Sequence, residues 1–392
     1  MPVSFRLAGS CFATAIVALS LAASSVAAAA WQPSVALTSS GFGLMWQGGV
    51  ATTSSGAFLV AYEDGYYGQY SAYLRRSTDH GTTWAKATRL SPACFSGGPQ
   101  IAADGNEVDA VWIETPFCDL SDTHRIAYRR SNDGGRTFGT ITTIAWTSAH
   151  SFPSVARGTD GTVLVGWTDD DTSTIYARTS VDGGTTFGPA IKIAQTTNEA
   201  YESLPGDHDG FARVALGSGV SYVGYYGKQH KLYVRMSTDH GSTWSSPTEL
   251  SASTDGYSWW SLSAEGTHAV AAFPEIGTNE WTRYRLTTDA GQTWSAPVDL
   301  SSPSGPDSSY PSVLLRDGVL RAVYSRMASN GWYAAFYRKG LENGSLSAPV
   351  KVSPRGEHAD AYPAGAEASG SATIVAYFLL NASGDAVYVR AR

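Results

Sequence analysis

The sequence has few charged residues. Asp, Glu, Lys and Arg make up 16% of the 392 residues, below the ~25% of an average globular protein. A helical bundle or coiled coil is rich in Glu and Lys, so this scarcity argues against both. The 27 basic residues are outnumbered by 34 acidic ones, and phosphate recognition needs clustered Lys and Arg. We therefore expect no nucleic-acid partner.

Long apolar runs are also missing, except near the start. Residues 1–30 carry one charge, Arg6, then an apolar run from Phe12 to Ala22 and a tail of small residues. This is the layout of a secretory signal peptide, and the run is shorter than the ~20 residues of a membrane span. We predict cleavage before Trp31, a secreted, extracellular product and no membrane span.

Cysteine is scarce as well, with three in the whole chain. Cys11 falls within the predicted signal peptide, which leaves Cys94 and Cys118 in the remainder. An exported protein with one pair of cysteines favours a disulfide between them.

Glycine and aromatic residues are abundant, with 41 Gly and 12% aromatics. This composition is typical of many short strands joined by tight turns. One turn recurs with the pattern Ser/Thr-x-Asp-x-Gly-x-Thr-aromatic, first from Ser77 to Trp84. Four further copies end at Phe138, Phe187, Trp244 and Trp294, and a decayed sixth copy runs from Gly340 to Leu346. In such a turn Asp accepts backbone N–H groups and Gly supplies a positive φ.

Two further columns extend the repeat to seven copies at a spacing of ~50 residues, the size of a four-stranded propeller blade. One column consists of aromatic residues that close a β-rich run: Tyr62, Trp112, Trp167, Tyr225, Phe273, Tyr324 and Tyr377. The other consists of arginines before the turn: Arg75, Arg129, Arg178, Arg235, Arg285, Arg338 and Arg390. We predict an all-β, seven-bladed propeller over residues 31–392, with six blades as the alternative. The segment from Trp31 to Thr38 is expected to complete the last blade and close the ring.

Repeated residues are expected to build the scaffold, so function should lie where the sevenfold pattern breaks. The loops between second and third strands open on the same face as the links into each first strand, and the Asp turns lie on the opposite face. Loops on a rigid scaffold are where binding residues concentrate. The unrepeated residues of this predicted mouth mix carboxylates with aromatics, which suits a carbohydrate partner: Glu63, Asp64, Glu202, Asp207, Tyr310, Trp46, Trp259, Trp260, Arg326 and His358.

Asp169, Asp170 and Asp171 form an acidic cluster that could bind a structural calcium ion. The cluster lacks the Asp-x-Asp-x-Asp-Gly spacing of a calcium loop. The sequence therefore predicts no cofactor and no catalytic metal, with calcium as an open alternative.

The Asp turns, placed in blade-sized repeats behind a signal peptide, resemble the Asp-box (bacterial neuraminidase repeat) propellers of the sialidase superfamily. The resemblance covers nearly all of residues 31–392 and implies an enzyme that acts on glycans. Sialidases carry an Arg-Ile-Pro motif where this chain reads Trp46-Gln47-Gly48. This departure argues against exo-sialidase activity.

The resemblance also implies roles for individual residues in a carboxylate-rich central site. Asp64 or Glu63 matches the acid/base of a first-blade loop, and Tyr310 in Tyr310-Pro311-Ser312 matches the nucleophilic tyrosine; Glu202 and Asp207 are other possible partners. Trp46, Trp259, Trp260, Arg326 and His358 would contact substrate. A glycoside hydrolase is the leading interpretation. A non-catalytic, lectin-like propeller and a polysaccharide lyase are the alternatives.

Overall fold

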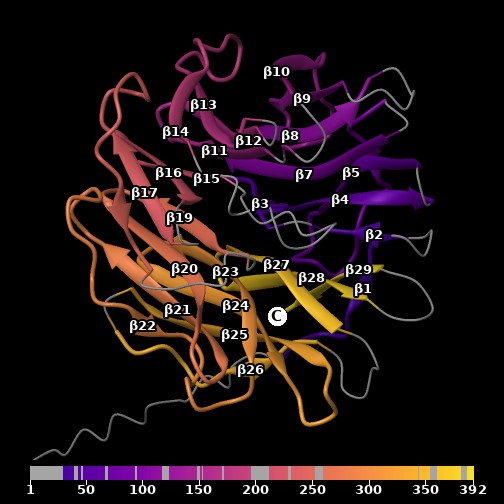
Figure 1. Ribbon diagram of the computed structural model, residues 1–392. Coiled ribbons are helices and arrows are strands. Elements are labelled where there is room, and N and C mark those ends of the chain that lie inside the picture. Colours follow the sequence, from indigo (N-terminus) through magenta and orange to yellow (C-terminus); the bar gives the residue numbers. More distant parts are fainter. Residues whose placement is uncertain are drawn as a thin grey trace, which may run out of the picture. The chain divides into compact units, whose positions relative to one another are not determined.

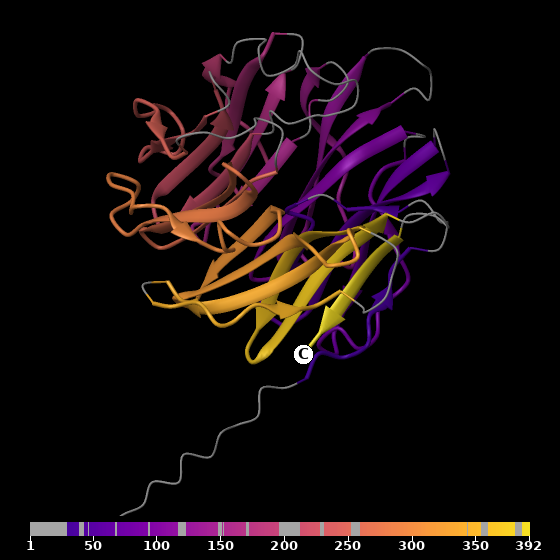
Figure 2. The same ribbon diagram turned by 60° about the horizontal axis from the view of Figure 1, so that its bottom comes forward.

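The computed structural model describes residues 30–38, 43–45, 47–66, 69–92, 95–116, 123–147, 151, 153–169, 172–195, 212–227, 231–251, 259–342, 344–353, 360–380 and 386–392. Trp31–Arg392 forms one compact unit. Its regular structure is entirely β (Figures 1 and 2). In these described ranges no helix is long and apolar enough to cross a membrane.

The unit is a seven-bladed β-propeller, as the repeats predict. Each blade is an antiparallel sheet whose strands pair in chain order, with the first strand innermost. The strands of the first three blades are β3 (Val50–Thr52), β4 (Phe58–Tyr66), β5 (Gln69–Ser77) and β6 (Thr88–Arg89) in blade I, where β2 (Gly43–Leu44) also pairs with β4; β7 (Phe95–Asp104), β8 (Glu107–Thr115), β9 (His124–Ser131) and β10 (Thr142–Thr147) in blade II; and β11 (Pro153–Arg157), β12 (Val163–Asp169), β13 (Thr174–Ser180) and β14 (Ile191–Gln195) in blade III.

The other four blades repeat this order. Their strands are β15 (Arg213–Gly217), β16 (Val220–Tyr226), β17 (Leu232–Ser237) and β18 (Thr248–Glu249) in blade IV; β19 (Ser261–Glu265), β20 (His268–Ile276), β21 (Glu280–Thr287) and β22 (Val298–Asp299) in blade V; β23 (Ser308–Arg316), β24 (Val319–Met327), β25 (Tyr333–Leu341) and β26 (Val350–Lys351) in blade VI; and β27 (Asp360–Ser369), β28 (Ala372–Leu380), β29 (Ala386–Ala391) and β1 (Val35–Ala36) in blade VII.

The N-terminal strand closes the ring, as predicted. β1 pairs antiparallel with β29, with Val35 opposite Val389. The backbone N–H of Leu37 donates to the carbonyl of Val387 at 2.8 Å, and the Leu37 side chain is fully buried. A closed ring leaves no open sheet edge at the junction between the two ends of the chain.

Apolar side chains fill the spaces between neighbouring blades. The repeated aromatics are buried there, and Tyr62, for example, packs with Ile374 and Val387 of blade VII. Alternate residues of a strand point to opposite faces. The aromatic column therefore marks the face of each second strand that is turned toward the preceding blade.

Four of the repeated arginines, Arg129, Arg178, Arg338 and Arg390, donate a hydrogen bond to the blade before their own. In Arg178, Nε donates to the carbonyl of Gly188 at 2.6 Å and Nη2 to that of Phe187 at 3.1 Å, both in the same blade. Nη1 donates to the carbonyl of Ile144 at 2.5 Å, in blade II. The same three kinds of bond occur in Arg129 and Arg338. These contacts confirm that the column belongs to the scaffold.

The Asp turns share one geometry. Asp239 accepts the backbone N–H of Thr243 at 2.9 Å and its hydroxyl at 2.6 Å, and Ser237 donates to the same carboxylate at 2.7 Å. Gly241 has a φ of +82°, which explains the glycine. The turns lie beside the connections between first and second strands: the N–H of Ala290, in the Asp turn of blade V, donates to the carbonyl of Thr267. They therefore define the Asp-box face, and the opposite end is the mouth.

Candidate active site at the mouth of the propeller

The two adjacent acids of blade I point in opposite directions. Glu63 follows Tyr62 on β4 and therefore faces blade II, where its carboxylate accepts the backbone N–H of Gly98 at 2.5 Å. Its exposed fraction is 5%. Glu63 is thus a buried carboxylate that holds the bulged start of β7, where the register shifts between Gly97 and Gln100.

Asp64 lies two residues after Tyr62, on the face of β4 that is directed toward blade VII, and it is partly exposed. The equivalent acids of two other blades are engaged in the scaffold. Glu114 is fully buried and accepts bonds from Arg125, Trp112 and Ser91, and Glu275 forms an ion pair with Arg283. Of the acids in this column, we take Asp64 of blade I as the candidate for the site.

Aromatic rings form a continuous arc across the mouth ends of blades V, VI and VII. The ring of Trp259, which precedes β19, lies 6.1 Å from that of Tyr310 on β23. Tyr310 meets Tyr362 of β27 edge-on at 4.6 Å. Tyr362 stacks on Phe378 of β28 at 5.1 Å, and Phe378 packs against the same cluster as Tyr62. The arc thus ends at the junction of blades VII and I, toward which Asp64 faces.

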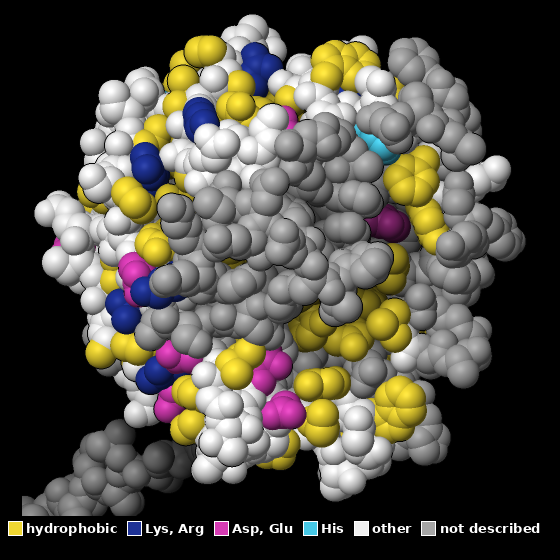
Figure 3. Space-filling model, in the orientation of Figure 1, with side chains coloured by type: hydrophobic (Ala, Val, Ile, Leu, Met, Phe, Trp, Pro, Cys, Tyr) yellow, Lys and Arg dark blue, Asp and Glu magenta, His cyan; other side chains and the backbone are white. Residues whose placement is uncertain are grey.

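Tyr310 is held in an unusual backbone conformation. Its φ is +55°, a region that residues other than glycine rarely adopt, and it falls at the bulge of β23 between Ser309 and Ser312. Bulges re-aim side chains and occur near active sites. In the space-filling view, hydrophobic side chains gather over β27 and β28, with acidic side chains beside them (Figure 3).

Arg213 stands at the end of the arc in blade IV. It begins β15, is 6% exposed, and lies 5.9 Å from the Trp259 ring. Its Nε donates to the carbonyl of Trp260 at 3.4 Å. Burial lowers the pKa of Arg213 to about 10, and the group remains a cation at neutral pH.

The mouth leads into a cavity of about 150 Å³ on the propeller axis, lined by Arg213, Gln47 and Gln100 among others. Gln47 donates from Nε2 to the carbonyl of Pro311 at 2.8 Å. Its Oε1 is buried and has no hydrogen-bond partner among the described residues. The axis thus offers both a cation and an amide acceptor to a bound polar group.

Other predicted residues take positions outside this arc. Trp260 is 2% exposed and lies close to the backbone of Gly224, so it is part of the core. Arg326 stacks its guanidinium 3.8 Å above the Phe336 ring. Asp169 accepts the backbone N–H of Thr172 at 3.1 Å within a turn. Several predicted residues lie outside the described residues: Trp46, Cys94, Cys118, Asp170, Asp171, Glu202, Asp207 and His358.

The described residues contain no cluster of three or more His, Cys, Asp or Glu that could hold a metal ion.

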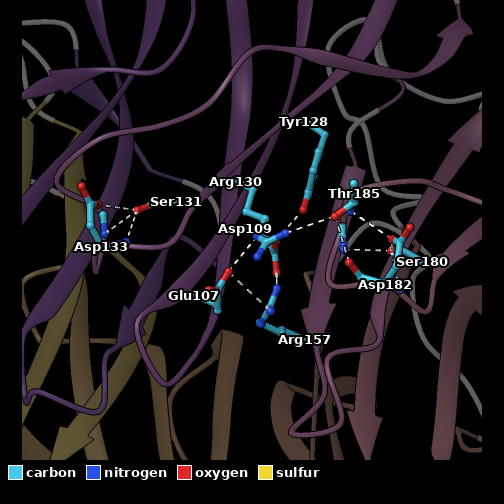
Figure 4. A network of polar contacts seen from close by, with 12 residues as sticks. Glu107, Asp109, Tyr128, Arg130, Ser131, Asp133, Arg157, Ser180, Asp182 and Thr185 are labelled. Carbon is cyan, nitrogen blue, oxygen red and sulfur yellow. Dashed lines mark hydrogen bonds and ion pairs between the residues drawn. The ribbon is translucent and has the colours of Figure 1, made fainter.

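Figure 4 shows a network of polar contacts around Asp109, Arg157, Glu107 and Arg130. Asp109 is completely buried, accepts the Tyr128 hydroxyl at 2.5 Å, and pairs with Arg157 at 2.8 Å. Arg157 also lies 3.8 Å from Glu107, which pairs with Arg130. Burial raises the pKa of Asp109, and the positive charge of Arg157 opposes that rise.

This network belongs to the Asp-box face. A Cβ atom on Gly184, in the Asp turn of blade III, would lie 1.8 Å from the Tyr128 hydroxyl. Arg157 lines a cavity of about 320 Å³ that all seven first strands surround. Because its charges are paired within and between blades II and III, we assign the network to blade packing.

Sequence reasoning missed Arg213 and the aromatic contacts. Arg213 opens β15 at the position where three other blades place a serine, namely Ser154, Ser261 and Ser312. It is thus itself a break in the repeated pattern, and that signal could have identified it.

Fold and repeats together define an Asp-box β-propeller. The chain belongs to the BNR repeat-like domain family, whose model matches residues 17–265 and 162–342. No curated protein matches the chain in sequence.

Solved structures with a similar fold include an arabinanase and a polysaccharide lyase. The chain is 15% identical to an α-L-arabinanase from Penicillium chrysogenum, with a TM-score of 0.54 over 93% of this chain and 98% of that one. It is 12% identical to an ulvan lyase of polysaccharide lyase family PL25, with a TM-score of 0.56 over 88% and 93%. It is 17% identical to a Hadza microbial sialidase, Hz136, with a TM-score of 0.49 over 71% of this chain, and it spans 63% of that protein's length.

Proposed function

We propose that this chain is a secreted enzyme that acts on glycans, as a glycoside hydrolase whose substrate lies across the mouth. The observation that carries the proposal is the aromatic arc from Trp259 through Tyr310 and Tyr362 to Phe378, which ends at the junction faced by Asp64. Aromatic rings offer apolar faces to sugar rings and polar tips to hydroxyls. Family membership and the predicted signal peptide over residues 1–30 support the proposal.

In this mechanism Asp64 is the general acid. It gives its proton to the glycosidic oxygen as the bond to the leaving sugar breaks, while a partner residue supplies the nucleophile or activates water on the other side of the ring. Tyr310 is the partner among the described residues, and Glu202 and Asp207 are the alternatives. Glu63 positions the start of β7 through Gly98 and is not the acid.

A polysaccharide lyase is the second candidate, and Arg213 is the observation that favours it. A lyase acting on a uronate needs a cation to neutralise the carboxylate and a base to remove the neighbouring proton. Arg213 lies against Trp259, and Trp259 against Tyr310, so one rim carries a cation and a tyrosine. A lectin-like propeller would use the same rings without cleavage.

The test is a panel of sialosides, arabinans and uronate polysaccharides. New reducing ends without unsaturated products establish a hydrolase, and unsaturated uronates establish a lyase. Binding without any product supports the lectin-like alternative. Asp64→Asn should lower the rate of hydrolysis by ~10²–10⁴-fold while binding persists. The matched control is Asp104→Asn, at the Asp-box end of β7, which should leave hydrolysis unchanged. Full hydrolysis by Asp64→Asn would overturn the assignment.

A further inference from the structure

A second group of aromatic rings lies at the mouth of blades I and II. Phe95, the first residue of β7, is 41% exposed. Its ring meets Tyr70 edge-on at 6.1 Å and His124 at 6.4 Å. None of these three residues was among the site residues predicted from the sequence.

This group is fixed by the scaffold. Ser96 is fully buried, and its hydroxyl accepts the backbone N–H of Ala72 at 2.9 Å and donates to the carbonyl of Tyr70 at 3.4 Å. Phe95 is paired with Thr115 of β8. The exposed face of Phe95 is therefore held in place by three strands rather than by a loop, and the ring is available for stacking without rearrangement of the backbone.

The group lies on the other side of Asp64 from the aromatic arc. Tyr70 is opposite Gly65 and Ser71 is opposite Asp64 in the hairpin of β4 and β5. Tyr70 extends from this hairpin toward Phe95 in blade II, whereas the arc approaches it from blade VII. A chain of sugars that passes Asp64 would thus meet aromatic rings before and after the point of cleavage.

We propose that Phe95, Tyr70 and His124 form a distal sugar subsite, and that the substrate is an extended polysaccharide rather than a single terminal sugar. This proposal rests on the proposed function, because it places the polymer across the same mouth. Phe95 supplies the stacking face, and Tyr70 and His124 border it with polar atoms. The single-sugar specificity of an exo-acting enzyme would leave this exposed ring without a ligand.

The experiment compares Phe95→Ala with the parent on a polymer and on a disaccharide of the same linkage. Loss of an aromatic anchor should raise KM for the polymer about tenfold and leave the disaccharide within about twofold. Phe95→Leu keeps an apolar side chain of similar volume but has no aromatic face, so it should show the same selective loss. Thermal unfolding of both variants reports on folding. Leu341→Ala, which alters a 62% exposed side chain near the Asp turns, is the control.

Equal effects of Phe95→Ala on polymer and disaccharide, or no effect on either, would overturn the distal subsite while leaving the proposed function intact. Cleavage of terminal sugars alone by the parent protein would also overturn the distal subsite and leave the proposed function intact. If the parent neither cleaves nor binds any glycan of the panel, the proposed function fails and the subsite fails with it.

Discussion

The carboxylate of Glu63 accepts the backbone N–H of Gly98 at 2.5 Å, across the boundary between blades I and II. Asp64, the next residue, faces the other boundary, between blades I and VII. One step along a strand therefore separates a carboxylate that holds the scaffold from one that faces the aromatic arc. This difference in direction is the reason for assigning distinct roles to two adjacent acids.

Single substitutions of the two acids should affect different properties: stability for Glu63 and activity for Asp64. Glu63→Gln weakens a buried, charge-assisted bond to Gly98 and should lower the free energy of unfolding by ~1–3 kcal/mol, with activity largely retained in the folded protein. Asp64→Asn should lower the rate of hydrolysis by ~10²–10⁴-fold, as loss of a general acid does, with little change in stability. Urea unfolding and steady-state assays on the same samples provide the two measurements. The reverse outcome, with activity lost only in Glu63→Gln, would transfer the catalytic role to Glu63.

The closure of the ring gives the second prediction. Leu37 is fully buried and packs with Val387, Val389 and Phe58 at the junction of blades VII and I. Leu37→Ala should lower the free energy of unfolding by ~2–5 kcal/mol, since it leaves a cavity at this junction. The exposed Leu341→Ala should change it by less than about 0.5 kcal/mol. Equal changes in the free energy of unfolding for both variants, measured by urea unfolding, would show that the N-terminal strand contributes little to closure.

Much of this fold could be predicted because each blade repeats the same local physics. The Asp turn needs a carboxylate and a glycine at fixed positions, the aromatic column packs between blades, and several of the arginines bond one blade to the next. A residue that appears seven times leaves a signal even when single copies decay. The return of β1 to β29 was predictable for the same reason, since Trp31–Thr38 has the pattern of a fourth strand.

The site was less predictable because it depends on contacts that occur once. Trp259, Tyr310 and Tyr362 recur at steps of 51 and 52 residues, the spacing of the blades, but that spacing does not show which of their rings touch. Glu63 and Asp64 lie one and two residues after Tyr62, so their directions follow from the alternation of side chains along β4. That alternation can be used only once it is known which blade Tyr62 packs against. The burial of Trp260, in contrast to Trp259, likewise depends on the direction in which β19 begins.

The third prediction concerns the buried network of blades II and III. Tyr128→Phe removes the hydroxyl that donates to Asp109 at 2.5 Å and should cost ~1–3 kcal/mol, because a buried carboxylate loses a partner. Asp109→Ala should cost more, ~3–5 kcal/mol, since it removes the closer of the two carboxylates that pair with the buried Arg157 cation. Tyr176→Phe, in a stacked ring of blade III, is the matched control. Urea unfolding that shows the same small loss for Tyr128→Phe and Tyr176→Phe would contradict the role given to the Asp109 bond.

The last prediction follows from the Asp turns. Hydrogen bonds from the hydroxyl and backbone N–H of Thr243 lower the pKa of Asp239 to about 2 from 3.8, and those from Thr293 do the same for Asp289. A carboxyl whose pKa is depressed by folding contributes stability above its unfolded pKa and loses it as the pH falls through the folded value. The parent should therefore lose stability between about pH 4 and pH 2.

Asp239→Asn tests this mechanism in one turn. The variant should melt at a lower temperature than the parent near pH 6, because the ionised acceptor is gone. The difference should shrink as the pH approaches 2, where the parent carboxyl is protonated too. Ser242→Ala, which changes the same turn without touching the carboxylate, should keep a constant difference from the parent across this range. Thermal melts that show a constant gap for Asp239→Asn would mean that its ionisation does not stabilise the turn.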